Sequence, residues 1–334
     1  MAHRLARALC KPEVGLEFNA GGRQYVLRGK IGTGAVGMVR KAADRQTGRV
    51  VAVKFLAPDP KYIEPSAFED VAERFRREGQ RGAGLRHQHL VDILAYEENA
   101  DGSAFLSRRV RNPFIVMEFV RGRTLESLIR NLSSADGMPL VTITKQALSV
   151  AARIAQALVY LHERRIIHRD VKPANVFVST TVVGAMPGEV KLGDFGVTKW
   201  GDFLAAASAG TLTMTNQQGL GTLKYMSPEQ AVRPKDVTVR SDMFSLGITL
   251  FELFTARILP SPHHVFEIMS VRNMRASITG KLYQLGITRP GAGHEVVFAP
   301  ILDMFLAASS RPTSKQIAGQ FEYWLERASE SDAV

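Results

Sequence analysis

The sequence predicts an α+β fold in which a strand-rich part precedes a mostly helical part. Residues 25–56 alternate apolar and polar positions over short runs, with Gly48 in a turn between two β-branched stretches, which is typical of strands. Residues 124–131 and 143–164 repeat their apolar side chains at helical spacing, and the stretch from Asp242 is apolar on nearly all faces, as in a buried helix. With 334 residues, 45% of them hydrophobic, the chain can form one large domain or two smaller ones.

Basic residues outnumber acidic ones, and the formal net charge is +11. They are dispersed among acidic residues, and no nucleic-acid recognition motif with interleaved aromatic residues accompanies them. Arg108, Arg109 and Arg111 form the densest cluster, which we interpret as solvated surface or as a patch for acidic substrates. We therefore expect no nucleic-acid partner.

The composition also bears on the cellular compartment. No apolar run reaches the roughly 18 residues that a transmembrane helix needs, and the first residues are too polar for a signal peptide. The one cysteine, Cys10, excludes an internal disulfide and fits a reducing compartment. We expect a cytoplasmic protein with no transmembrane segment in this chain.

The residues best suited to chemistry lie in short polar loops within residues 166–196. The run HRDVKPAN occupies 168–175, and the run DFG occupies 194–196. Each of these residues taken alone is ordinary in a core or a turn. Together, eight matched positions in this order and spacing resemble the H-R-D-x-x-x-x-N loop and the D-F-G turn of protein kinases.

Phosphoryl transfer explains these residue types. By the resemblance, Asp170 would accept the proton of the attacking hydroxyl, and Lys172 would place a positive charge on the γ-phosphate of ATP. Asn175 and Asp194 offer hard oxygen ligands, which suit Mg²⁺ or Mn²⁺. In the family, a lysine two residues after the aspartate marks serine/threonine kinases. The resemblance therefore implies transfer of the γ-phosphate of ATP to serine or threonine hydroxyls of protein substrates.

The same resemblance implies a two-lobed fold, with a strand-rich small lobe that has one main helix and a mostly helical large lobe. The implied parts of the chain are a basic N-terminal extension at 1–24, the small lobe at 25–120, the large lobe at 121–327 and a C-terminal tail at 328–334. We interpret the extension as a short basic helix and a linker, because a pair of glycines ends it. The runs FRRE and SPEQ are most similar to those of bacterial eukaryotic-like serine/threonine kinases.

A glycine-rich segment precedes a strand lysine. Gly32, Gly34 and Gly37 form G-x-G-x-x-G, and a strand follows where a dinucleotide-binding fold would begin a helix. The segment therefore resembles the kinase glycine-rich loop, with Val36 at the position where many relatives have an aromatic residue. Lys54 in VAVKFL matches the family lysine that contacts the α- and β-phosphates.

A charged helix is predicted over 66–86, and by resemblance its Glu78 pairs with Lys54; Glu73 is the alternative partner. Glycines at 79, 82 and 84 cost about 1 kcal/mol each in a helix interior, which predicts a loosely held helix. Alanine at 79 and 82 is then expected to raise basal activity. In the alternative interpretation, the helix ends near Glu78 and a loop follows.

The resemblance also implies which residues bind the nucleotide. Met117 would be the gatekeeper, and the main-chain groups of Glu118 and Val120 would hydrogen-bond adenine. The implied nucleotide-binding set is Ile31, Gly32, Gly34, Gly37, Val39, Ala52, Lys54, Glu78, Met117, Glu118, Val120, Asn175 and Asp194. Asp170, Lys172 and Lys54 make up the implied catalytic set.

Residues 197–229 resemble an activation segment, which ends in Ser227-Pro228-Glu229 where the family has A-P-E. By resemblance, Glu229 pairs with Arg311, and Asp242 supports the backbone of the catalytic loop. We predict that the protein phosphorylates itself at Thr213 or Thr215, with Thr211 and Ser208 as alternative sites, and that a dimer allows one copy to act on the other. Two alternatives remain, a pseudokinase scaffold that binds nucleotide without efficient transfer and a small-molecule kinase of similar fold.

Overall fold

The computed structural model describes residues 13–34, 36–59, 68–99, 104, 112–133, 145–179, 187–194, 224–256 and 295–331. The chain divides into two compact units. The small unit comprises Met1–His87 and Val91–Phe119, and the large unit comprises Gln88–Leu90 and Val120–Val334. None of the helices in the described ranges is long and apolar enough to span a membrane.

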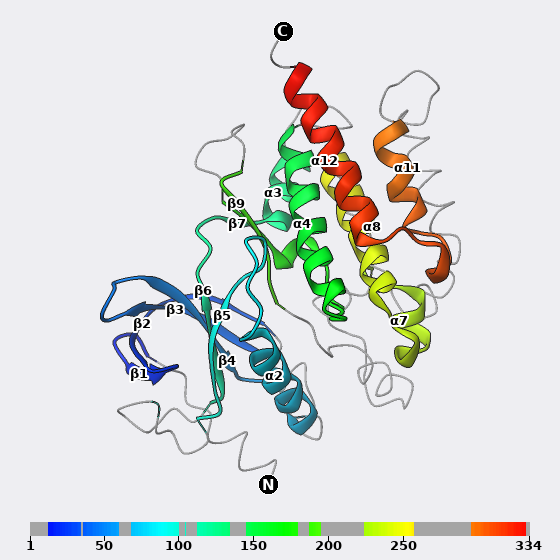
Figure 1. Ribbon diagram of the computed structural model, residues 1–334. Coiled ribbons are helices and arrows are strands. Elements are labelled where there is room, and N and C mark those ends of the chain that lie inside the picture. Colours follow the sequence, from blue (N-terminus) through cyan, green and yellow to red (C-terminus); the bar gives the residue numbers. More distant parts are fainter. Residues whose placement is uncertain are drawn as a thin grey trace. The chain divides into compact units, whose positions relative to one another are not determined.

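The small unit is built on a six-stranded sheet in which all neighbouring strands are antiparallel, in the order β1-β2-β3-β4-β6-β5 (Figure 1). The strands are β1 (Glu17–Ala20), β2 (Arg23–Thr33), β3 (Gly37–Asp44), β4 (Val50–Leu56), β5 (Ile93–Glu97) and β6 (Phe114–Glu118). The alternation over residues 25–56 thus predicted strands correctly. The apolar core packs on one face of this sheet and includes Val53, Phe55 and Phe114, which are all fully buried.

Strand β1 belongs to this sheet, so the prediction that residues up to 24 form a helix and a linker outside the fold is wrong for Glu17–Gln24. Gly21 and Gly22 have φ values of 53° and 73°, and they form the turn between Ala20 and its partner Arg23. Two consecutive residues with positive φ are typical of a tight hairpin turn, which glycine adopts without strain. Residues 1–12, including Cys10, lie outside the described part of the chain.

Helix α2 (Phe68–Gly82) lies against β5, and Figure 1 shows it beside the sheet. It extends through Glu78 to Gly82, so the alternative that it ends near Glu78 is wrong. Gly79 is buried, and a Cβ atom there would lie only 2.5 Å from the ring of Tyr96. The helix is therefore packed closely against β5 at Gly79, and the prediction of a loosely held helix is wrong at that position.

The large unit is mostly helical. The predicted helices at 124–131, 143–164 and from Asp242 are confirmed by α3, α4 and α8, and α12 packs along α4 (Figure 1). The elements of the large unit within the described residues are β7 (Arg123–Thr124), α3 (Leu125–Ser133), α4 (Lys145–Glu163), η2 (Pro173–Asn175), β8 (Val176–Ser179), β9 (Glu189–Leu192), α7 (Pro228–Val232), η3 (Pro234–Asp236), α8 (Val239–Thr255), α11 (Glu295–Asp303), η5 (Ala308–Ser310) and α12 (Ser314–Ser331). Residues 241–255 of α8 are all buried, as its uniformly apolar pattern predicted.

Candidate active site

The loop that carries the HRD run is anchored to helix α8 through Asp242, which is fully buried. Its two carboxylate oxygens accept hydrogen bonds of 2.8 Å each from the backbone N–H groups of His168 and Arg169. Arg169 has a φ of 66°, a conformation that costs a non-glycine residue energy and that such bonds help to maintain. The prediction that Asp242 supports this backbone is confirmed.

The carboxylate of Asp170 is held from both sides. Nζ of Lys172 lies 2.9 Å from Oδ1, and Nδ2 of Asn175 donates to Oδ2 at 2.9 Å. The short 3₁₀ turn η2 brings Asn175 back toward Asp170, because the N–H of Asn175 donates a hydrogen bond to the carbonyl oxygen of Lys172 at 2.9 Å. Two side chains that the sequence predicted as functional, those of Lys172 and Asn175, therefore converge on the carboxylate of Asp170, a residue that is 4% exposed.

Asn175 and Asp194, the predicted metal ligands, lie at the same end of the β8–β9 hairpin. Asn175 immediately precedes β8, Asp194 follows β9, and the N–H of Gly193 donates to the carbonyl oxygen of Asn175 at 2.9 Å. Nδ2 of Asn175 donates twice to Asp170, at 2.8 and 2.9 Å, which orients the side-chain oxygen of Asn175 away from Asp170. An amide oxygen beside a carboxylate suits Mg²⁺ or Mn²⁺, so these two side chains fit the predicted ion. Residues 195 and 196 of the DFG run lie outside the described part.

Lys54 pairs with Glu78, as predicted. Nζ of Lys54 donates to Oε1 of Glu78 at 2.8 Å, and the side chains are only 13% and 9% exposed. The alternative partner, Glu73, instead contacts Arg76 and Arg77 on its own helix, so it is excluded. Because Lys54 lies in β4 at the centre of the sheet and Glu78 lies in α2, the pair joins the helix to the sheet.

The glycine-rich segment connects β2 to β3, and its glycines differ in what the surrounding protein requires. A Cβ atom at Gly37 would lie 1.9 Å from the carbonyl oxygen of Phe55, so the fold itself demands glycine there. At Gly32 and Gly34, no described atom lies within 4 Å of an added Cβ. The described neighbours therefore do not require glycine at these two positions, and bare backbone there would allow a group such as a phosphate to approach closely.

The predicted adenine-contacting residues lie at and after the end of β6. Met117 pairs with Ala52 of β4 in the sheet register. The N–H of Glu118 donates to the carbonyl oxygen of Asp92 at 2.9 Å, so this main-chain donor is engaged within the protein. A Cβ atom at Gly122 would lie 2.1 Å from the carbonyl oxygen of Val178. Glycine is therefore required where the chain passes β8.

A model of the protein kinase domain matches residues 25–288 of this chain. The chain belongs to the protein kinase family. The kinase domain is 37% identical over 246 residues to the probable serine/threonine-protein kinase PknB of Bifidobacterium longum, with 71% of this chain and 31% of that protein covered. It is 38% identical over 237 residues to the serine/threonine-protein kinase PrkC of Bacillus subtilis, with the same coverage of 71% and 31%. The chain thus spans about a third of the length of these relatives.

Solved structures confirm the fold. The kinase domain of Mycobacterium tuberculosis PknI, crystallised as a C20A mutant, superposes with a TM-score of 0.60 over 94% of this chain and 99% of that chain. The sequence identity is 20%, so this similarity concerns the fold alone. The predicted α+β kinase fold, with a strand-rich sheet unit and a mostly helical unit, is confirmed.

Glu229, in the kinase's S-P-E element, pairs with Arg311 as predicted. Nη2 of Arg311 donates to Oε2 at 3.0 Å, and the hydroxyl of Ser241 donates to Oε1 at 2.7 Å. Burial opposes ionisation of this carboxyl group, but the hydrogen bonds and charge of Arg311 outweigh it and hold the pKa of Glu229 below its usual value. The ionised carboxylate therefore stabilises the folded kinase domain.

This pKa shift predicts a pH dependence of stability. Because the folded-state pKa of Glu229 lies below the unfolded-state value, its contribution is complete above the unfolded pKa and is lost as the pH falls through the folded pKa. We expect urea stability to fall less for Glu229→Gln than for the parent as the pH is lowered from about 6 to below about 4. Glu326→Gln, which changes an exposed carboxylate, is the matched control. Parallel curves for the parent and Glu229→Gln would contradict the assignment.

Two residues that position the catalytic loop were not identified from the sequence. Nε2 of His162 lies 2.9 Å from Oδ2 of Asp242, and its Nδ1 lies 3.0 Å from the hydroxyl of Ser314. Nε2 of Gln230 donates to the carbonyl oxygen of Arg169 at 3.0 Å. His162 follows Leu158 by four positions, so a polar residue on the inward face of that helix was the available signal.

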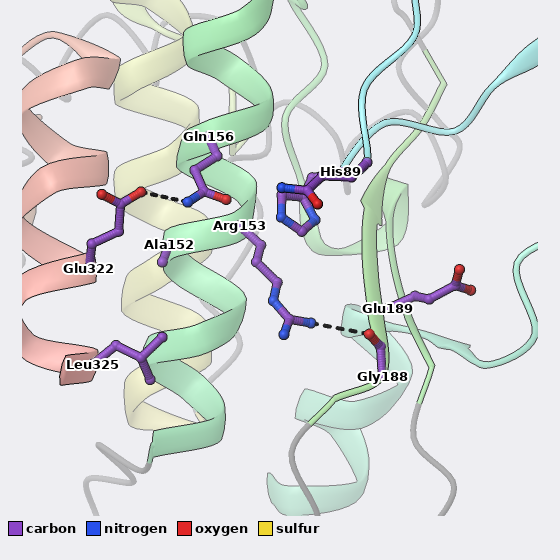
Figure 2. Close-up of a pocket in the computed structure, with 9 residues that line it drawn as sticks. His89, Ala152, Arg153, Gln156, Gly188, Glu189, Glu322 and Leu325 are labelled. Atoms are coloured by element: carbon purple, nitrogen blue, oxygen red, sulfur yellow. Dashed lines mark hydrogen bonds between the residues drawn. The ribbon is translucent and has the colours of Figure 1, made fainter. Parts of the chain in front are cut away.

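A cavity of about 470 Å³ lies in the large unit, away from these residues (Figure 2). Its lining residues are Gln88, His89, Ala152, Arg153, Gln156, Gly188, Glu189, Glu322 and Leu325. Gln156 bonds Glu322 at 2.5 Å, and Arg153 donates to the carbonyl oxygen of Gly188 at 3.4 Å. None of the predicted site residues that the structure describes is among these lining residues, so the cavity is not the candidate active site.

Proposed function

We propose that this protein is a serine/threonine protein kinase that transfers the γ-phosphate of ATP to serine and threonine hydroxyls of protein substrates. The observation that carries the proposal is the arrangement of Lys172 and Asn175 around the buried carboxylate of Asp170. The names of the similar bacterial proteins, serine/threonine-protein kinases, support the residue class of the acceptor.

Each residue has a role in this proposal. Asp170 orients the acceptor hydroxyl and takes its proton, and Lys172 places a positive charge on the γ-phosphate. Asn175 and Asp194 hold Mg²⁺, or Mn²⁺, which would neutralise negative charge on the phosphates. Lys54, oriented by Glu78, contacts the α- and β-phosphates.

The remaining proposed residues bind the nucleotide through backbone and apolar contacts. The glycine-rich segment would offer bare backbone to the phosphates, and the main-chain groups of Glu118 and Val120 would bond adenine. Ile31, Val39, Ala52 and Met117 are proposed to contact the nucleotide with their side chains. Loss of a residue that takes part in phosphoryl transfer would favour the pseudokinase alternative. The four residues proposed for this chemistry are all present in the sequence, namely Lys54, Asp170, Asn175 and Asp194.

Incubation of the purified protein with MgATP, followed by mass spectrometry, tests the proposal. We expect phosphate on serine or threonine of the protein and of a mixed peptide library, and none when a chelator removes the divalent ion. Sugar and aminoglycoside acceptors in parallel reactions test the small-molecule alternative. Nucleotide binding without transfer to any acceptor would instead support the pseudokinase alternative.

Phosphorylation of Thr213 or Thr215, which lie outside the described residues, is expected to activate the kinase. A phosphothreonine carries about −1.5 to −2 charges and would bond the guanidinium of Arg169, next to Asp170. One charge-assisted hydrogen bond is worth about 1.5–3 kcal/mol, so preincubation with MgATP should raise the rate at least about tenfold. The double variant Thr213→Ala/Thr215→Ala should lack this rise in a peptide phosphorylation assay.

The dependence of the autophosphorylation rate on protein concentration distinguishes a reaction in trans from a reaction within one copy. If one copy of the kinase acts on another, the initial specific rate of phosphate incorporation should increase with protein concentration, whereas a reaction within one copy would be independent of it. Equal peptide phosphorylation by the parent and the double variant, with no phosphate on residues 208–215 of the parent, would contradict activation through these threonines.

A further inference from the structure

Helix α2 approaches strand β5 unusually closely at Gly79. The helix buries Phe75, Glu78, Gly79 and Gly82 on one face, and β5 packs against it. A Cβ atom at Gly79 would lie 2.5 Å from Cδ2 of Tyr96, 2.7 Å from its Cγ and 2.9 Å from its Cβ. Because Cβ of Tyr96 is bonded directly to the strand backbone, no rotamer of Tyr96 moves it away. The helix therefore lies nearer to β5 than any residue with a side chain at 79 allows.

The other two glycines of this region make different demands. A Cβ at Gly82 would lie 2.2 Å from Cδ1 of Ile93 but 3.1 Å from its Cγ1, and Cδ1 is the free end of a side chain that can rotate. At Gly84, nothing described lies within 4 Å of an added Cβ. Alanine is a better helix former than glycine, so helix propensity alone favours alanine at both 79 and 82. Packing opposes that preference strongly at 79 and weakly at 82, whereas Gly84 lies beyond the end of α2 and no described atom opposes a side chain there.

Glu78 is the immediate neighbour of Gly79, and its carboxylate reaches Lys54. The backbone of Lys54 is paired with Val39 and Ile115 in the sheet, so it does not move with a displaced helix. Relieving the contact between Cβ atoms at 79 and 96 requires a shift of about half an ångström. A shift of that size along the Lys54–Glu78 bond would lengthen it from 2.8 Å to beyond the usual limit of about 3.2 Å.

We propose that Gly79 is a positioning residue, which lets α2 approach β5 closely enough for Glu78 to hold Lys54. Nζ of Lys54 also lies 5.9 Å from the ring centroid of Phe75, so two groups that face the amine move with α2. The inference rests on the proposed kinase function, in which the orientation of Lys54 matters for phosphoryl transfer. A small residue at 79 is thus part of the catalytic geometry, although it contacts no reactant.

The test compares Gly79→Ala, Gly82→Ala and the matched control Gly84→Ala, with kcat and KM for ATP measured on a peptide acceptor. We expect kcat to fall at least about tenfold for Gly79→Ala, to fall slightly for Gly82→Ala and to stay within about twofold of the parent for Gly84→Ala. In a Glu78→Gln background, Gly79→Ala should lower kcat by less than about a further twofold, because the pair it acts through is already lost.

A second measurement does not depend on transferase activity. The rate at which an amine-reactive ester acylates Lys54, read by mass spectrometry, should rise in Gly79→Ala and in Glu78→Gln, because the amine is no longer held beside a carboxylate. It should be unchanged in Gly84→Ala. If these acylation rates are observed and the parent transfers no phosphate, the proposed function is refuted but the positioning role is supported.

Two results would overturn the positioning role. The first is equal kcat and equal Lys54 acylation in Gly79→Ala and Gly84→Ala. The second is a loss of kcat for Gly79→Ala that is as large in the Glu78→Gln background as in the parent. Such a loss would show that the substitution acts through the packing of α2 and not through the Lys54–Glu78 pair. If Gly79→Ala does not fold, the double variant Gly79→Ala/Tyr96→Ala replaces it, and Tyr96→Ala alone is its reference. The substitution of Tyr96 removes Cδ2 and Cγ, the two atoms that would lie closest to a Cβ at residue 79.

Discussion

Replacing Asp170 with asparagine should lower kcat by about 10²–10⁴-fold, because the acceptor hydroxyl loses its proton acceptor. Nucleotide affinity should remain close to that of the parent, since Asn175, Asp194 and Lys54 are retained. Asparagine has nearly the same shape, and its side-chain oxygen can still accept the hydrogen bond from Nδ2 of Asn175 that Asp170 accepts at 2.9 Å. Peptide phosphorylation and titration with a fluorescent ATP analogue measure the two quantities.

The matched control is Asp236→Asn, which makes the same chemical change at a side chain that is 56% exposed in the large unit. It should leave both kcat and nucleotide affinity unchanged. Near-normal turnover by Asp170→Asn would refute the assignment of Asp170 as proton acceptor. A large loss of nucleotide affinity would show that its carboxylate mainly organises the binding site.

Replacing Phe18 with alanine should destabilise the small unit by about 3–5 kcal/mol, which is the usual cost of emptying a buried phenylalanine site. Phe18 is 1% exposed, and its ring lies 5.3 Å from the rings of both Tyr25 and Phe114. The effect therefore tests whether strand β1, which precedes the matched kinase segment, is part of the core. Urea unfolding followed by circular dichroism measures the change.

Val14→Ala, at an apolar residue that is 64% exposed in the same N-terminal part, is the control for Phe18→Ala. Surface substitutions of this kind usually change stability by less than about 0.5 kcal/mol. A loss for Phe18→Ala no larger than this would contradict the assignment of β1 to the core. Loss of stability in the first variant alone would support it.

Local sequence patterns predicted much of the fold and of the site. The run at 168–175 predicted residues that meet around Asp170, because neighbours within one short turn are brought together by the turn itself. Helices α3 and α4 were predicted because their apolar residues repeat at helical spacing, and α8 was predicted because its sequence is apolar on nearly all faces. Pairs between distant segments, such as Lys54–Glu78 and Glu229–Arg311, were predicted through the family resemblance and not from spacing.

Strand β1 was missed although its signal was present. The pair Gly21-Gly22 separates two short runs that can each form a strand, which is a hairpin pattern as well as a break. The basic residues before it favoured the interpretation as an extension. What decides between the two is whether Phe18 finds an apolar partner, and that partner, Phe114, is 96 positions further along the chain.

The sequence by itself determined the kinase family and the residue types that phosphoryl transfer needs, because these are properties of order and spacing along the chain. Only the tertiary structure decided the meaning of the glycines in α2. Helix propensity assigns Gly79 and Gly82 the same cost, whereas the structure separates them by what lies opposite, a strand-bound Cβ at one and a movable methyl group at the other. The distance between two backbones depends on every residue that packs between them, so it cannot be obtained from the pattern of either segment alone.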